Sequence, residues 1–127
     1  GFDFLGWHFE RGYKWPRDKS LDRFKEVLRE ETPRNSGLSL DVIIERLNRR
    51  LHGWYRYFRG GVLNVYQRLD QWLRGRLRSV LRRRDKRKGR GRGRDQNRYP
   101  NDYFAELKLI SLYASAQAER TSPATCG

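Results

Sequence analysis

The segment from Leu40 to Phe58 constrains the fold most, because its apolar residues recur at intervals of three or four positions. These residues are Leu40, Ile43, Ile44, Leu47, Leu51, Trp54, Tyr55 and Phe58. Such spacing places them on one face of an α-helix, so the pattern predicts a long amphipathic helix that buries this face. Ser39 is a suitable N-cap, and Gly60 and Gly61 end the pattern.

Two features inside this segment leave alternatives open. Asn48 could cap a fresh helix and so divide the segment in two, or the helix could continue through it. The rings from Trp54 to Phe58 stand among arginines, a composition that suits either a packed core or a surface on which bases stack. Core packing is favoured, because most of these rings continue the apolar stripe. Tyr57 lies off the stripe and is expected to have a polar or nucleic-acid-facing role.

Two further amphipathic segments flank this helix. The first begins at Ser20, a predicted N-cap, and ends at Thr32 and Pro33. The second runs from about Asn64 to Leu81. The apolar faces of the three segments predict one shared core. Its expected members are Phe24, Leu28, Ile43, Leu47, Leu51, Trp54, Phe58, Leu69 and Leu77.

The two ends of the chain differ from this helical centre. Residues 1–16 alternate aromatic and polar side chains around Glu-Arg-Gly, which predicts a β-hairpin. Residues 85–98 alternate glycine with arginine and contain no apolar side chain, so we expect a disordered linker. Helical spacing returns in a C-terminal extension at 99–120, and 121–127 reads as a tail.

Charge limits the classes of partner. The formal net charge is +14 over 127 residues. A surplus of this size predicts a polyanionic partner, with nucleic acid first and an anionic membrane surface second. No apolar run approaches the roughly 20 residues that span a bilayer, so the sequence predicts no membrane insertion.

Catalysis and metal binding have little support in the sequence. His8 and His52 stand far apart, and Cys126 has no second cysteine with which to form a disulfide or a zinc site. Neither Asp-Asp nor Asp-x-Asp occurs, although metal-dependent phosphoryl transfer needs such carboxylates. We therefore expect no catalytic residue and no metal ligand in this chain.

Arginines supply the strongest functional signal. Arg74, Arg78 and Arg82 recur at intervals of four and predict a basic ridge opposite the apolar stripe of their helix. Guanidinium groups remain charged and bind phosphates in a forked geometry. The full set of predicted RNA-binding residues is Arg23, Lys25, Arg29, Arg49, Arg56, Arg59, Arg68, Arg74, Arg76, Arg78, Arg82, Arg83, Arg84, Lys86, Arg87, Lys88, Arg90, Arg92 and Arg94.

Five motifs in order resemble one known family. They are FLGWHF at 4–9, RFKEVLRE at 23–30, SLDVIIERLN at 39–48, GWYRYFR at 53–59 and LDQWLRGRLR at 69–78. Their order and spacing resemble the maturase-specific domain of group II intron-encoded reverse transcriptases, the region of the thumb and domain X. YPNDYFAELKLISL resembles a C-terminal extension of many bacterial members. Arg49 stands where the family commonly has proline, which weakens the case for a helix break at Asn48.

The resemblance implies a mainly α fold. An N-terminal β-hairpin at 1–16 would mark the edge of the polymerase palm, and a thumb-like bundle of three to four helices would occupy 17–84. The basic flexible segment and a C-terminal helix would follow. Within the hairpin, the residues similar to the primer grip are Phe4, Leu5, Gly6 and Trp7.

The resemblance also implies a function and its partners. The domain would bind group II intron RNA to assist splicing and would hold the template-primer duplex during reverse transcription, beside the fingers and palm of the same polypeptide. The chain itself would need no cofactor, since Mg²⁺ would lie in the missing palm and in the intron RNA. The alternative is a stand-alone basic RNA chaperone or a ribosome-associated RNA-binding protein. A third hypothesis, polymerisation or cleavage by the chain itself, lacks the carboxylates.

Two remaining expectations concern the origin of the chain. It contains no methionine, which is typical of a piece cut from a longer polypeptide. Its single cysteine fits a reducing, intracellular compartment, so we expect a cytoplasmic protein. The resemblance of its C-terminal extension to that of bacterial members implies a bacterial rather than an organellar origin.

Overall fold

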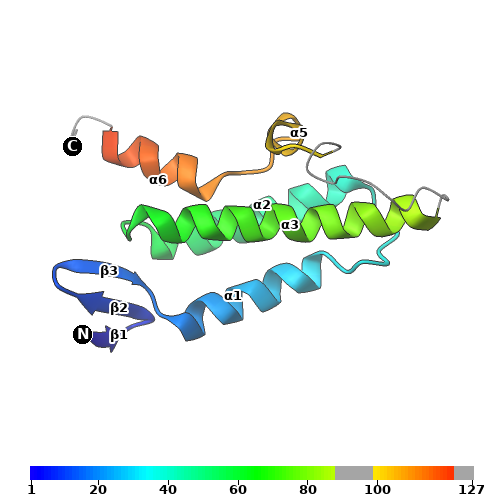
Figure 1. Ribbon diagram of the computed structural model, residues 1–127. Helices are drawn as coiled ribbons and strands as arrows, with labels where there is room; N and C mark the ends of the chain where they lie inside the picture. Colours follow the sequence, from blue (N-terminus) through cyan, green and yellow to red (C-terminus); the bar gives the residue numbers. More distant parts are fainter. Residues whose placement is uncertain (88–98, 122–127) are drawn as a thin grey trace.

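The computed structural model describes residues 1–87 and 99–121, and in them the chain is mainly helical. A three-stranded antiparallel sheet precedes the helices (Figure 1). The elements are β1 (Phe2–Phe4), β2 (Trp7–Glu10), β3 (Tyr13–Pro16), α1 (Asp18–Glu31), α2 (Leu40–Phe58), α3 (Leu63–Arg87), α5 (Asn101–Glu106) and α6 (Leu112–Thr121). The predicted fold class, an N-terminal β element followed by a helical bundle, is confirmed.

The predicted hairpin has become a sheet of three strands. Leu5 and Gly6 both have positive φ, 51° and 89°, and turn the chain between β1 and β2. β1 pairs with β2 so that Phe4 lies opposite Trp7, and β2 pairs with β3 so that Trp7 lies opposite Pro16. Two residues with positive φ make the tight turn that connects antiparallel strands best. The alternation of side chains therefore predicted extended backbone correctly but did not reveal the first turn.

Helix α1 begins earlier than predicted. Its N-cap position is Arg17, so the prediction that Ser20 caps the helix is wrong. The Ser20 hydroxyl instead donates to the carbonyl of Gly6 at 3.0 Å, and the Arg17 N–H donates to the same oxygen at 2.9 Å. These two bonds attach the first turn of α1 to the sheet. Thr32 follows the last residue of α1, as predicted.

Helix α2 is continuous. Ser39 is its N-cap, as predicted, and accepts the Val42 N–H through its hydroxyl oxygen at 3.4 Å. The alternative of a break at Asn48 is wrong, since the helix runs unbroken through this position. The side chain of Asn48 bonds another part of the chain: its Nδ2 donates to the Lys108 carbonyl at 2.8 Å, and its Oδ1 accepts the Ile110 N–H at 2.9 Å.

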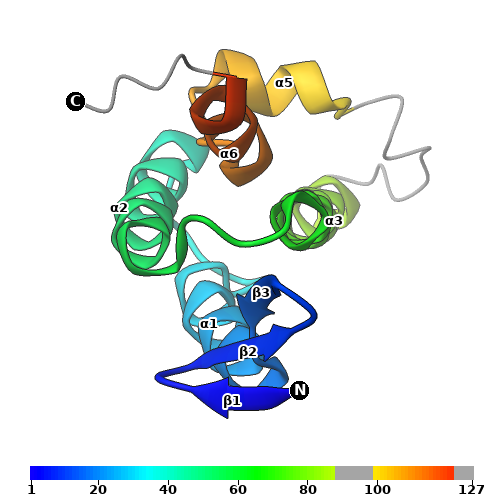
Figure 2. The same ribbon diagram turned by 90° about the vertical axis from the view of Figure 1, so that its left-hand side faces the viewer.

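Helices α2 and α3 form the middle of the molecule (Figures 1 and 2). The sheet and α1 lie on one side of this pair, and α5 and α6 lie on the other (Figure 2). Within the part of the chain that is described, no helix is both long and apolar enough to cross a bilayer. α3 continues through Arg87, three residues into the segment predicted to be a disordered linker. The rest of that prediction, 88–98, falls outside the described residues.

One core joins all of these helices. Of the predicted core residues, the buried ones are Phe24, Leu28, Ile43, Leu47, Leu51, Leu69 and Leu77. Trp54 and Phe58 are partly buried, and Trp54 stacks on Phe24 with ring centroids 4.7 Å apart and on Phe58 at 4.8 Å. Trp54 and Phe58 therefore belong mainly to packing. Tyr57 is exposed, and its hydroxyl donates to the Leu5 carbonyl at 2.7 Å, which links α2 to the β1–β2 turn.

The C-terminal extension forms two helices rather than one. α5 ends at Glu106, Lys108 has a φ of 69°, and α6 begins at Leu112. Phe104, Leu112 and Ala116 are buried in the same cluster as the long helices. The extension therefore completes the core of the domain.

Candidate nucleic-acid interface

The predicted RNA-binding side chains fall into groups with different surroundings. Three arginines, Arg76, Arg78 and Arg84, hold parts of the fold together through hydrogen bonds. The exposed members are Arg23, Arg29, Arg49, Arg56, Arg59, Arg68, Arg82 and Arg83, whereas Lys25 and Arg74 are partly buried. The side chains of Lys86, Arg87, Lys88, Arg90, Arg92 and Arg94 lie outside the described residues.

Arg76 attaches α3 to the end of α1. Its Nε donates to the Thr32 hydroxyl at 3.1 Å, and a terminal nitrogen donates to the Thr32 carbonyl at 2.9 Å. A cation at a helix C-terminus complements the helix dipole. Desolvation lowers the pKa of Arg76, and the charges of Arg34 and Arg29 lower it further. Three guanidinium groups thus gather where α1 ends beside α3.

Arg84, about two helical turns after Arg76 in α3, also bonds backbone carbonyls outside its own helix. A terminal nitrogen donates to the Leu38 carbonyl at 2.5 Å and to the Ser36 carbonyl at 3.3 Å. The connection between α1 and α2 is thereby attached to α3. Arg84 was predicted to bind RNA, because nothing in the local sequence indicates that two carbonyls lie beside it.

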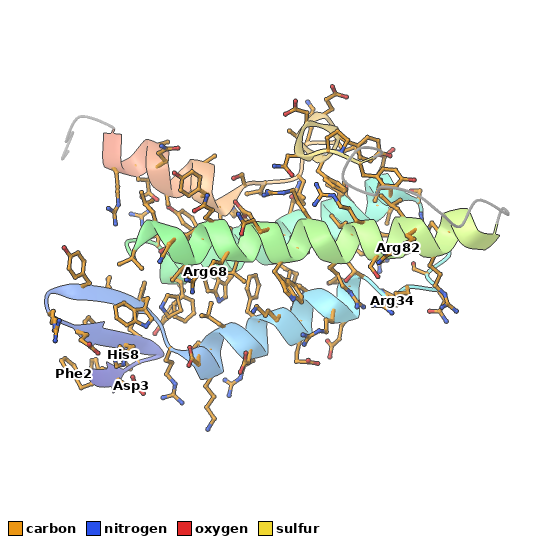
Figure 3. The ribbon with its side chains drawn as sticks, in the orientation of Figure 1. Phe2, Asp3, His8, Arg34, Arg68 and Arg82 are labelled. Atoms are coloured by element: carbon orange, nitrogen blue, oxygen red, sulfur yellow. The ribbon has the colours of Figure 1, made fainter. Side chains whose placement is uncertain are left out.

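Arg78, the middle of the predicted ridge, is covered by the C-terminal segment. Its Nε donates to the Tyr99 carbonyl at 2.7 Å, and a terminal nitrogen donates to Asn101 Oδ1 at 2.9 Å. Its guanidinium also lies 5.5 Å from the ring centroid of Phe104. The ridge of Arg74, Arg78 and Arg82 is therefore interrupted at its centre. Arg82 lies nearer the far end of α3 (Figure 3).

A polar cavity of about 770 Å³ lies where this segment crosses α3. Its lining residues are Gln71, Arg74, Gly75 and Arg78 from α3, together with Pro100, Asn101 and Asp102 at the start of α5. Arg74 is partly buried, and its Nε has no hydrogen-bond partner among the described residues. This cavity was not predicted, because it needs residues that are about 25 positions apart to meet.

The face that α1 and α3 share has a different character. Trp72 is partly buried there, with Lys25 Nζ 5.6 Å and the Arg29 guanidinium 5.3 Å from its ring centroid. Arg68 lies nearer the sheet, and Arg34 lies by the end of α1 (Figure 3). We call Lys25, Arg29, Arg34, Arg68, Trp72 and Arg76 the α1–α3 face. Arg29 also pairs with Glu26, and the cleft that Lys25 and Arg68 line includes the carboxylates of Asp18 and Asp22.

Several arginines in or next to α2 form ion pairs with glutamates. Arg49 pairs with Glu45 at 3.3 Å, and Arg59 lies 3.8 Å from Glu119. Arg50, which the prediction omitted, pairs with Glu31 at 2.9 Å. Exposed pairs of this kind contribute about 0–1 kcal/mol each to stability. They also lower the local positive potential around Arg49, Arg50 and Arg59.

The residues similar to a primer grip sit at the β1–β2 turn. Phe4 and Leu5 are 59% and 67% exposed, Gly6 is in the turn itself, and Trp7 is buried. Phe2 and Tyr13 on the same sheet are also exposed. Several exposed apolar side chains on one small sheet are typical of a surface that contacts another molecule or domain.

His8 lies on the same sheet between two carboxylates. Its Nδ1 is 2.7 Å from Asp3 Oδ1, and its Nε2 is 3.0 Å from Glu10 Oε1 (Figure 3). The hydrogen bond with Glu10 and then that with Asp3 raise the pKa of His8. In residues 1–87 and 99–121, no group of three or more His, Cys, Asp or Glu side chains is arranged so that it could hold a metal ion.

These features define a basic, mainly α domain with a small N-terminal sheet and a positively charged face. The family described as "Group II intron, maturase-specific domain" matches residues 21–99, more than half of the chain, and the protein belongs to this family. The maturase-specific domain is non-catalytic and serves the splicing of group II introns. No curated protein sequence matches the chain. The sheet, α5 and α6 lie outside the matched residues.

Proposed function

We propose that the chain assists group II intron splicing by binding the intron RNA directly, mainly through the α1–α3 face. The observation that carries the proposal is the charge of this face, where Lys25 and Arg68 lie on two adjacent helices together with Arg29 and Arg34. Phosphate contacts by such side chains release counterions and supply most of the affinity for RNA. Trp72 offers a partly exposed ring among these cations, and aromatic rings stack on unpaired bases.

Binding to a structured group II intron RNA across a range of salt concentrations tests the proposal. We expect affinity to fall with salt, because each phosphate contact adds about 0.7–0.9 to the slope of log affinity against log salt concentration. Replacing both Lys25 and Arg68 by alanine should reduce the salt slope by about two. A matched double variant, Arg49→Ala with Arg50→Ala, should change it less, because each of these arginines already pairs with a glutamate.

Two outcomes would contradict RNA binding through this face. One is an affinity that does not respond to salt. The other is a larger loss in the Arg49 and Arg50 variant than in the Lys25 and Arg68 variant. An unrelated structured RNA of equal length separates a maturase from the alternative, a general RNA chaperone, since a chaperone should bind both RNAs equally.

The same face is our candidate for holding a template-primer duplex. The supporting observation is its position beside β3, whose Tyr13 and Trp15 line one cleft with Arg68. The same sheet carries the exposed Phe4 and Leu5, which resemble a primer grip. A competition experiment decides whether one surface serves both ligands. An RNA/DNA hybrid duplex should displace the intron RNA, and it should bind the Lys25 and Arg68 variant more weakly.

The sheet is our candidate for contact with the fingers and palm of the same polypeptide. Phe2, Phe4, Leu5 and Tyr13 supply exposed apolar surface at the N-terminal end of the domain. The coding sequence upstream of Gly1 tests this idea directly. Polymerase motifs that run into Gly1 would support it, and an initiator codon adjacent to Gly1 would reject it.

A further inference from the structure

The cavity between α3 and the start of α5 contains an arginine whose bonding is incomplete. Arg74 Nε is buried and has no hydrogen-bond partner among the described residues. Buried donors in folded proteins nearly always have an acceptor, because an unsatisfied one destabilises the fold. Guanidinium groups favour phosphate oxygens as acceptors, since these carry negative charge and match the forked donors.

Arg78 provides a second, fixed guanidinium one helical turn away. Its bonds to the Tyr99 carbonyl and Asn101 Oδ1 hold it at the cavity wall. Among the described residues that line the cavity, Asp102 is the one carboxylate beside the two arginines. A ligand that suits it has an anionic group for Arg74 and hydrogen-bond donors for the carboxylate and amide oxygens.

Gly75 lines the cavity between these arginines. A Cβ atom at this position would meet no atom within 4 Å. Glycine inside a helix is less stable than alanine, so its presence in α3 is not explained by helix formation. The cavity volume of about 770 Å³ falls within the range of small-molecule sites and suffices for a nucleotide.

We propose that this cavity binds one unpaired nucleotide of the intron RNA, with its phosphate on Arg74 and its hydroxyl or base N–H groups on Asp102 and Asn101. The proposal rests on the proposed function and adds a defined subsite to it. A paired nucleotide does not fit, because its base is stacked inside a duplex and cannot enter a cavity. Since residues 100–102 lie beyond the family match, the subsite depends on the C-terminal segment of this chain.

Filling the cavity is the first test. In Gly75→Phe the new ring occupies the space between the arginines without removing either of them. We expect the affinity for group II intron RNA to fall about tenfold, the effect of losing one bound base. Gly75→Ala should bind as the wild type does. Gly53→Phe is the matched control, because Gly53 lies inside α2 and also has nothing within 4 Å of a Cβ.

Unchanged affinity in a folded Gly75→Phe protein would overturn the subsite and leave RNA binding intact. Arg74→Lys provides a second variant should the phenylalanine disturb folding, since lysine keeps the charge but has no Nε donor. It should lower the affinity, whereas Arg46→Lys on the exposed surface of α2 should not. Equal effects of the two lysine substitutions would also overturn the proposal.

A direct binding measurement tests the subsite separately from the proposed function. The proposed function is refuted if the chain does not bind the intron RNA, and the subsite can still be tested. The NMR signal of the Arg74 Nε–H group is followed while a short single-stranded RNA, adenosine monophosphate or inorganic phosphate is added. A shift with the RNA and the nucleotide, and a smaller one with phosphate, supports the subsite. No shift, or equal shifts with all three, overturns it.

Discussion

Asp70 in α3 accepts the backbone N–H of Leu112 at 3.0 Å and thereby caps a helix 42 positions later in the chain. The same carboxylate accepts the Tyr113 N–H at 3.0 Å and the Ser111 hydroxyl at 2.8 Å. Its residue is only 6% exposed. A buried carboxylate with three donors at the start of α6 fixes the position of that helix on α3.

We predict that Asp70→Ala lowers the free energy of unfolding by about 2 kcal/mol, because it leaves two backbone N–H groups at the start of α6 without their acceptor. Urea denaturation measures the change. Asp22→Ala, on the exposed surface of α1, is the control and should stay within about 0.5 kcal/mol of the wild type. Equal stability of the two variants would show that α6 does not depend on this cap.

Asn48 provides a second test of the same attachment. Asn48→Ala removes the bonds to the Lys108 carbonyl and the Ile110 N–H, so we expect a loss of about 1–2 kcal/mol in the free energy of unfolding. Helix content should remain, since alanine favours the interior of α2. Circular dichroism and urea denaturation measure the two effects. Asn35→Ala, in the exposed connection before α2, is the control. A large loss of helix content in Asn48→Ala would contradict the assigned role.

Apolar spacing predicted the three long helices because each of them buries one face. In α2 an apolar residue recurs every four positions, at Ile43, Leu47 and Leu51. One polar residue, Asn48, therefore does not interrupt the helix. What spacing cannot predict is the partner of a polar side chain that is distant in sequence. Asn48 was singled out as a cap, yet its partners lie 60 and 62 positions away.

The candidate site illustrates the same limit. Arg74 and Arg78 were predicted to lie on the face of α3 opposite its apolar stripe, but both are partly buried, and the local pattern contains no sign that residues 99–102 cross this part of α3. The ridge was therefore predicted as open surface, whereas the fold encloses part of it in a cavity. Arg76 shows the converse case, since an arginine predicted to contact RNA serves to attach α1 to α3.

The roles of Arg68 and Arg76 can be separated experimentally. Arg76→Ala removes both donors to Thr32, which is buried, so we predict a loss of about 1–3 kcal/mol in the free energy of unfolding. Arg68→Ala should change stability by less than about 0.5 kcal/mol, because this arginine is exposed. In the RNA-binding assay, Arg68→Ala should reduce the salt slope by about one. The assignment fails if Arg68→Ala destabilises the fold as much as Arg76→Ala does.

The cluster of His8, Asp3 and Glu10 predicts a pH dependence of the sheet. Hydrogen bonds to Glu10 and Asp3 raise the pKa of His8 above 6.5, its ordinary value, so protonated His8 favours the folded state. This contribution to stability is complete below the unfolded pKa and is lost as the pH rises through the higher pKa of the folded state. The hydrogen bond with His8 lowers the pKa of Glu10 from 4.5, so the contribution of Glu10 is lost as the pH falls through that lowered value.

We therefore predict that the melting temperature is higher near pH 5.5 than near pH 8, because the raised pKa of His8 means that the folded state binds the proton more tightly and this contribution is lost as the pH rises. His8→Gln should remove most of this difference, since glutamine can bond both carboxylates but does not titrate. His52→Gln is the matched control, because His52 is exposed on α2, away from the sheet. The fluorescence of Trp15, whose ring centroid is 5.0 Å from that of His8, gives a local readout of the same titration. If the pH dependence persists in His8→Gln and disappears in His52→Gln, the ion pairs of the sheet do not govern it.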